Sequence, residues 1–88
     1  MASAPPRVTV LLFASAREAV GRSRLAWPVP KGGLRAEDLV RALADEYPRL
    51  QSTLKASRYV RNGTYLEDLA TRVRPGDEFA VHPPYGGG

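Results

Sequence analysis

Apolar residues follow two different spacings along this chain, and each spacing predicts a different element. In RVTVLLFA, residues 7–14, β-branched and aliphatic side chains dominate, which is typical of a buried strand. Across residues 36–47 the apolar positions recur every three or four residues, and they predict an amphipathic helix that ends before Pro48. The apolar stripe of this helix consists of Ala36, Leu39, Val40, Leu43 and Tyr47.

Turn-forming residues separate the other elements in the first half of the chain. The stretch SAREAVG, residues 15–21, is expected to form a turn that Gly21 ends by taking a positive φ. Residues 22–29 then predict a second strand, which Pro28 confines to the edge of a sheet or to the strand's own end.

The second half of the chain predicts strands that return to the same sheet. Residues 48–57 are expected to be a linking stretch anchored by two leucines, and Asn62-Gly63 predicts a tight hairpin turn. A turn at residues 75–77 precedes a final strand at residues 78–82. The order is β-β-α-β-β-β, in which one helix must cover one face of one mixed sheet. It predicts an α+β fold of the β-grasp, or ubiquitin-like, type, with four to five strands covered by one main helix.

The 88 residues leave room for one small domain with a single core and no deep catalytic cleft. We expect this domain to occupy residues 7–82. Residues 1–6 would form a flexible leader before it, and residues 83–88 an extended, glycine-rich tail after it.

One face of the predicted sheet is left uncovered by the single helix. Side chains of a strand alternate between faces, and we expect the faces that carry Val10 and Val81 to form the core. This assignment leaves Leu11, Phe13 and His82 on the open face, with Tyr65 beside them after the hairpin turn. Contiguous exposed apolar residues often mark partner sites. These four residues are therefore the predicted partner interface, although isolated apolar residues on a surface are also normal.

The charged residues do not favour nucleic-acid binding, although the net charge is +4. Basic and acidic residues are interleaved along the chain and no two basic residues are adjacent, which is typical of a mixed, solvated surface. The absence of cysteine excludes disulfides and thiolate chemistry, and there is no secretory signal or apolar run of membrane-spanning length. We expect a cytoplasmic protein that does not enter membranes. His82 is the only histidine, and the sequence predicts neither a catalytic constellation nor a metal site.

The last residues, VHPPYGGG, carry the candidate chemistry. Pro83 and Pro84 would form a stiff spacer, and the glycines that follow form a thread slim enough for a narrow channel. At about 3.3 Å per residue, the tail would reach roughly 20 Å. A carboxylate at Gly88 is unreactive by itself, but a mixed anhydride with AMP would activate it. A sulfur nucleophile would then displace AMP and leave a C-terminal thiocarboxylate.

Two blocks of the sequence resemble the small subunit of molybdopterin synthase, the MoaD-like family of ubiquitin-fold sulfur carriers. VTVLLFASAREAVG is similar to the family's first strand with its FA-x-x-RE-x-x-G continuation. PGDEFAVHPPYGGG is similar to its closing block, in which G-D-E and a hydrophobic strand precede PP-x-x-GG. The resemblance covers nearly the whole chain after the leader.

This resemblance implies a function for the tail. An adenylyltransferase of the ubiquitin-activating type would use ATP to adenylate Gly88, and this chain would bind no cofactor itself. After thiocarboxylation, the tail would enter the large subunit of molybdopterin synthase and donate sulfur to the dithiolene of molybdopterin. The residues inserted there would be Pro83, Pro84, Tyr85, Gly86 and Gly87. Phe13, Tyr65 and His82 fall at positions similar to the family's hydrophobic contact patch.

Three features depart from the family pattern. Gly86 stands where a small hydroxyl residue is common, His82 replaces a more apolar residue, and the basic net charge is unusual. Two further functions remain open on the sequence: a related sulfur carrier for thiamine thiazole or tRNA thiolation, and a non-catalytic β-grasp binding module. A related sulfur carrier would differ from a molybdopterin carrier only in the enzyme that accepts the sulfur. A binding module would keep its function after removal of the last glycines.

Overall fold

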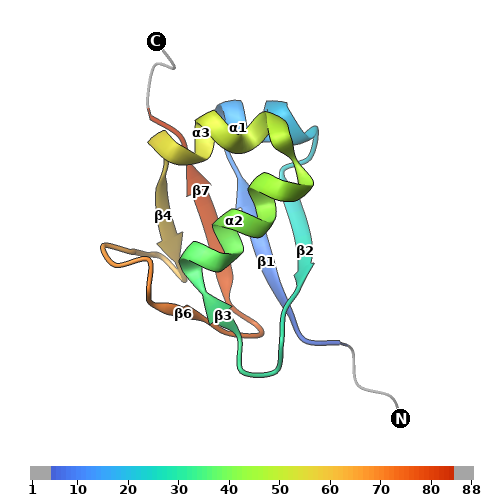
Figure 1. The fold of residues 1–88 in the computed structure, drawn as a ribbon, viewed down its shortest axis with the longest axis vertical. Coiled ribbons are helices and arrows are strands. Elements are labelled where there is room, and N and C mark those ends of the chain that lie inside the picture. Colours follow the sequence, from blue (N-terminus) through green and yellow to red (C-terminus); the bar gives the residue numbers. More distant parts are fainter. Residues whose placement is uncertain (1–4, 85–88) are drawn as a thin grey trace.

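The first and last long strands lie side by side in the middle of the sheet (Figure 1). The computed structural model describes residues 5–84. In it, β1 (Arg7–Leu12) pairs in parallel with β7 (Glu78–His82) and antiparallel with β2 (Arg24–Pro28). On the other side of β7 lie β4 (Arg58–Arg61) and then β5 (Thr64–Tyr65), both antiparallel to their neighbours. The order β2-β1-β7-β4-β5 is that of a mixed, five-stranded sheet, and it confirms the predicted β-grasp fold.

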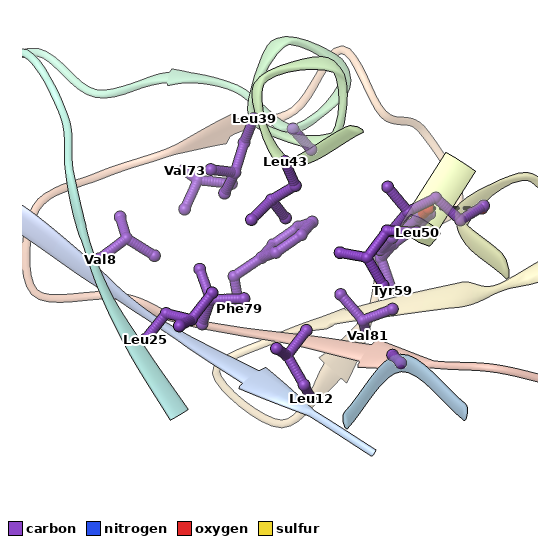
Figure 2. Close-up of a cluster of buried hydrophobic side chains, with 14 of the residues drawn as sticks. Val8, Leu12, Leu25, Leu39, Leu43, Leu50, Tyr59, Val73, Phe79 and Val81 are labelled. Atoms are coloured by element: carbon purple, nitrogen blue, oxygen red, sulfur yellow. Dashed lines mark hydrogen bonds between the residues drawn. The ribbon is translucent and has the colours of Figure 1, made fainter. Parts of the chain in front are cut away.

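The main helix, α2 (Ala36–Glu46), lies across one face of this sheet (Figure 1). Its stripe faces the core as predicted: Ala36, Leu39 and Leu43 are fully buried, while Val40 and Tyr47 are half-buried at its margin. In Figure 2, Leu39 and Leu43 lie over the ring of Phe79 on β7. Burial of aliphatic and aromatic side chains between the helix and the sheet is the main driving force for this arrangement.

The predicted faces of the strands are confirmed. Val8, Val10 and Leu12 of β1 are buried in the core, and so are Phe79 and Val81 of β7. The ring of Phe79 also stacks on Tyr59, with the ring centroids 5.4 Å apart. The hydroxyl of Tyr59 donates a hydrogen bond to the carbonyl of Leu54 at 2.6 Å, and burial raises the pKa of Tyr59 to about 12.

Two stretches that were expected to be a turn and a linker contain short helices instead. Residues 15–21 belong mostly to α1 (Ala14–Val20), and Gly21 ends it at φ 84° with its N–H bonded to the carbonyl of Arg17. The stretch after α2 forms the 3₁₀ turn η1 (Pro48–Leu50) and then α3 (Gln51–Ala56). The two leucines of this stretch, Leu50 and Leu54, are buried as predicted. Both short helices lie at the end of the sheet where β7 ends (Figure 1). None of the helices in residues 5–84 is long and apolar enough to cross a membrane.

A second, two-stranded sheet was not predicted. It pairs β3 (Leu34–Arg35) with β6 (Arg72–Val73) at the opposite end of the molecule from α1 and α3 (Figure 1). Gly33 makes this pairing possible, because its φ is +77° and a Cβ there would lie 2.0 Å from the carbonyl oxygen of Val73. Only glycine combines that backbone angle with so close an approach.

The turn at residues 62–63 and the turn at residues 74–77 are linked by hydrogen bonds to one carboxylate, that of Asp77. Asn62 and Gly63 both have positive φ, which confirms the predicted tight hairpin. Asp77 accepts hydrogen bonds from the Arg61 side chain at 2.7 Å, from the backbone N–H of Arg74 at 2.8 Å and from the Asn62 amide at 2.9 Å. Burial by itself raises the pKa of Asp77. These hydrogen bonds and the Arg61 charge outweigh it, so that the pKa lies below its ordinary value.

Candidate functional site

Phe13 and His82 come together on the open face, next to the point where the tail leaves the domain. Their rings are stacked, with centroids 4.6 Å apart and planes 18° from parallel. Phe13 is 43% exposed and His82 is half-buried, so that the stacked pair is partly open to solvent. Stacked aromatic pairs gain about 0.5–1.5 kcal/mol beyond the area they bury.

The end of β1 explains the position of Phe13. Phe13 keeps an extended backbone, at φ −118° and ψ 155°, so its side chain continues the alternation of β1 on the open face. Ala14 then takes φ 49°, in the left-handed region, and the chain turns sharply into α1. The carbonyl of Phe13 accepts the N–H of Ala16 at 3.0 Å, which fixes the start of that helix.

Neighbouring strands extend the aromatic pair into a wider surface. Ala80 of β7 lies between Leu11 of β1 and Val60 of β4 in the register of the sheet, so these three side chains share the open face. Leu11 and Val60 are half-buried, and the short side chain of Ala80 is shielded between them. We define Leu11, Phe13, Val60, Ala80 and His82 as the open-face patch.

Tyr65 borders this patch on the next strand. It is 61% exposed and is the register partner of Val60, so it shares the open face, while β4 and β7 separate it from β1. At a strand spacing of about 4.8 Å, the backbone of Tyr65 is roughly 14 Å from that of Leu11. The structure therefore brings Leu11, Phe13 and His82 together and places Tyr65 farther out, at the β5 edge of the same face.

Two residues at this site were missed in the sequence, and both are arginines. Arg58 is the partner of His82 in the register of β4 and β7, and Arg24 is the partner of Leu11 in that of β1 and β2. Both are exposed. The alternation of each strand assigns their faces, but only the register of the sheet places them beside the patch. The side of the open face nearest the tail is therefore basic.

The tail begins where β7 ends at His82. Pro83 is half-buried and Pro84 is exposed. The other predicted tail residues, Tyr85, Gly86, Gly87 and Gly88, lie outside the described residues. Within residues 5–84, no group of three or more His, Asp or Glu side chains is placed to hold a metal ion. What the described part offers is a partly exposed aromatic pair at the base of the tail.

The fold and this surface define a class of small β-grasp proteins whose last strand ends beside an aromatic pair on an open sheet face. The sequence pattern of the ThiS family matches residues 10–88. A relative from Dictyostelium discoideum, named "Molybdopterin synthase sulfur carrier subunit", is 32% identical over 80 residues, which cover 90% of this chain and 93% of the relative. The chain therefore belongs to the ThiS family of small β-grasp proteins.

Solved structures agree with this fold. The crystal structure of SAMP1 from Haloferax volcanii superposes with a TM-score of 0.80 at 28% identity, over 93% of this chain and 99% of that one. The complex of subunits 1 and 2 of the molybdopterin-converting factor from Helicobacter pylori gives a TM-score of 0.66 at 22% identity, over 93% of this chain and 99% of that one. At that identity the second similarity is evidence for the fold alone.

Proposed function

We propose that this chain is the sulfur-carrying small subunit of a molybdopterin synthase and that its reactive group is the carboxylate of Gly88. The observation that carries the proposal is the family match, because it includes the closing glycines as well as the β-grasp domain. The name of the Dictyostelium discoideum relative supports molybdopterin synthesis as the pathway.

The proposed chemistry has two activation steps. On an adenylyltransferase of the ubiquitin-activating type, the Gly88 carboxylate attacks the α-phosphorus of ATP, pyrophosphate leaves and an acyl adenylate forms. Hydrosulfide then attacks the acyl carbon, the bond to AMP breaks and one proton is released. The product is a thiocarboxylate, whose sulfur is a better nucleophile than the original oxygen. ATP belongs to the activating partner, and this chain supplies only the acyl group.

The large subunit of the synthase is the proposed acceptor. The open-face patch would dock on it, and residues 83–88 would enter its active site as a thread. The solved complex of the two Helicobacter pylori subunits supports a partner of this kind, because one chain of that complex has the same fold. We further propose that this transfer takes place in the cytoplasm, where both partners would act.

The proposal is tested by changing only the end of the chain. One variant lacks Gly88 and another carries one additional residue after it. In an assay reconstituted with the activating enzyme, ATP, a sulfide donor and the large subunit, we expect both variants to lose sulfur transfer. Their thermal unfolding should match that of the unchanged protein, because residues 83–88 follow the last strand. Normal sulfur transfer by either variant contradicts the proposal.

A second candidate is a protein modifier. The superposed Haloferax volcanii protein is SAMP1. A similar solved structure, from Methanosarcina acetivorans, is that of small archaeal modifier protein 1, for which SAMP1 is the abbreviation. In that case the adenylated Gly88 would react with the amine of a lysine on a target protein and form an amide bond, with loss of AMP. Mass spectrometry separates the two: the carrier gains one sulfur atom, whereas the modifier forms a covalent adduct with a second protein. Carriers for thiazole or tRNA thiolation differ only in the enzyme that accepts the sulfur.

A further inference from the structure

A groove of about 790 Å³ opens between the helices and the β5 edge of the sheet. Its apolar lining comes from α2, α3, β4 and the segment that begins at β5, and it consists of Val40, Ala44, Leu54, Tyr59, Tyr65, Leu66 and Leu69. Several of these side chains pack on the hydrophobic core, so the groove has an ordered apolar floor. Binding sites in proteins commonly have volumes of about 300–1,000 Å³.

The charged residues that line the groove are unevenly divided. Arg41, Lys55 and Arg58 are basic, and Glu67 is the only acidic residue among them. Arg41 lies 3.6 Å from Asp38, but both side chains are largely exposed, so this ion pair is weak and readily exchanged. Among the described residues, Lys55 and Arg58 form no ion pair.

The acidic residues of α2 lie outside the groove. Glu37, Asp38, Asp45 and Glu46 belong to the same helix as Val40 and Ala44, yet none of them lines it. Asp38 is paired with Arg41, so the acidic residues of α2 border the groove without lining it. A basic lining attracts anionic partners and repels cationic ones.

The groove also adjoins the base of the tail. Arg58 lines it and is at the same time the partner of His82 in the sheet. Arg58 therefore lies at the edge of β4, between the groove on the helix side of the sheet and the open-face patch on the other side. Tyr65, which borders the open-face patch beside Val60, is also among the residues that line the groove.

We propose that this groove binds an acidic, amphipathic peptide segment of a partner protein. The apolar floor requires several apolar side chains, which a short segment provides at alternate or helical positions. The three cations come from α2, α3 and β4, so the anionic groups that pair with them must be spread along the occupant. A peptide with several Asp or Glu side chains meets this requirement, whereas a small molecule with one anionic group does not.

A library of random 12-residue peptides displayed on phage tests the preference directly. The full chain is immobilised, and peptides are selected at physiological ionic strength. We expect the enriched peptides to combine Leu, Ile or Phe with Asp or Glu. A synthetic peptide of the consensus sequence, added to the isotope-labelled chain, should shift the NMR signals of Val40, Ala44 and Leu69 more than those of Leu11 or Phe13.

Two charge-reversal variants provide a matched comparison. Lys55→Glu places an acidic residue in the lining, and Arg49→Glu makes the same change on the neighbouring η1 turn, outside the lining. Both residues are exposed, so neither change removes a core contact. We expect Lys55→Glu to weaken binding of the consensus peptide at least 10-fold and Arg49→Glu to weaken it less than 3-fold.

Several results would overturn the proposal. These are a selection that enriches no peptide, enriched peptides without acidic residues, and NMR shifts centred on the open-face patch. Self-association of the chain in sedimentation experiments, lost in Lys55→Glu, would mean that a second copy occupies the groove instead. The proposal does not depend on the sulfur chemistry, because peptide binding is measured without ATP or activating enzyme.

Discussion

Replacing Asp77 with asparagine should destabilise the domain strongly without touching the tail. The carboxylate accepts three hydrogen bonds between 2.7 and 2.9 Å, two of them at Oδ2 from Arg61 and from the backbone of Arg74. Its side chain is only 13% exposed, and that of Arg61 is 31% exposed. Solvent therefore screens this pair less than an ordinary surface ion pair. Asparagine keeps the size of the side chain but loses the charge and one acceptor oxygen.

The magnitude follows from these contacts. Hydrogen bonds to charged groups contribute about 1.5–3 kcal/mol each, but bonds within one network are not additive and asparagine retains one carbonyl acceptor. We expect Asp77→Asn to lower the free energy of unfolding by about 2–3 kcal/mol. For a domain of this size, the Tm should fall by roughly 10–20 °C. Asp45→Asn makes the same chemical change at an exposed position on α2 and should have little effect.

The pH dependence gives an independent test of the same reasoning. The pKa of Asp77 is lower in the folded state than in the unfolded state, so its stabilising contribution is complete above the unfolded value of about 4. The contribution is lost as the pH falls through the folded-state pKa. Urea unfolding should therefore show a large difference between the unchanged protein and Asp77→Asn at pH 7, which shrinks below pH 4. If the two proteins have the same free energy of unfolding at pH 7, or if their difference stays constant down to pH 2, the stabilising role of the ionised Asp77 carboxylate is refuted.

Two further substitutions test the open face and the second sheet. Phe13→Arg should weaken binding to the large subunit at least 10-fold in titration calorimetry. The far-UV circular dichroism should stay unchanged, because Phe13 lies outside the core. Unfolding of this variant would mean that Phe13 is assigned to the wrong face of the sheet. Gly33→Ala should lower the free energy of unfolding, measured in urea, by about 2–4 kcal/mol, because the new Cβ would overlap the backbone of Val73. Gly32→Ala is the control: a Cβ there meets open space, and the free energy of unfolding should change by less than about 0.5 kcal/mol. Equal stability of the two alanine variants would contradict the close approach.

Elements with strong local signals could be predicted from the sequence. The alternation of Val8, Val10 and Leu12 assigned the buried face of β1, and Asn62-Gly63 specified a turn that needs two positive φ angles. In both cases the physical cause lies within a few neighbouring residues. The same alternation placed Phe13 and His82 on the open face, where the structure stacks them.

The elements that were missed depend on contacts between distant parts of the chain. α1 is only seven residues long, has no side-chain N-cap and buries only Ala16, so its sequence resembles a turn. The strands β3 and β6 have two residues each and exist because Gly33 lets the two segments approach. The groove combines residues from α2, α3, β4 and the segment that begins at β5, and no local pattern indicates that they meet.

The central claim is that Gly88 carries sulfur, and intact mass spectrometry tests it most directly. The full chain is incubated with an activating enzyme, ATP and a sulfide donor, and the enzyme is shown in parallel to act on a known carrier. The account predicts a mass gain equal to the exchange of one oxygen for one sulfur, located at Gly88 by fragmentation and absent without ATP. An unchanged mass under these conditions would contradict the claim.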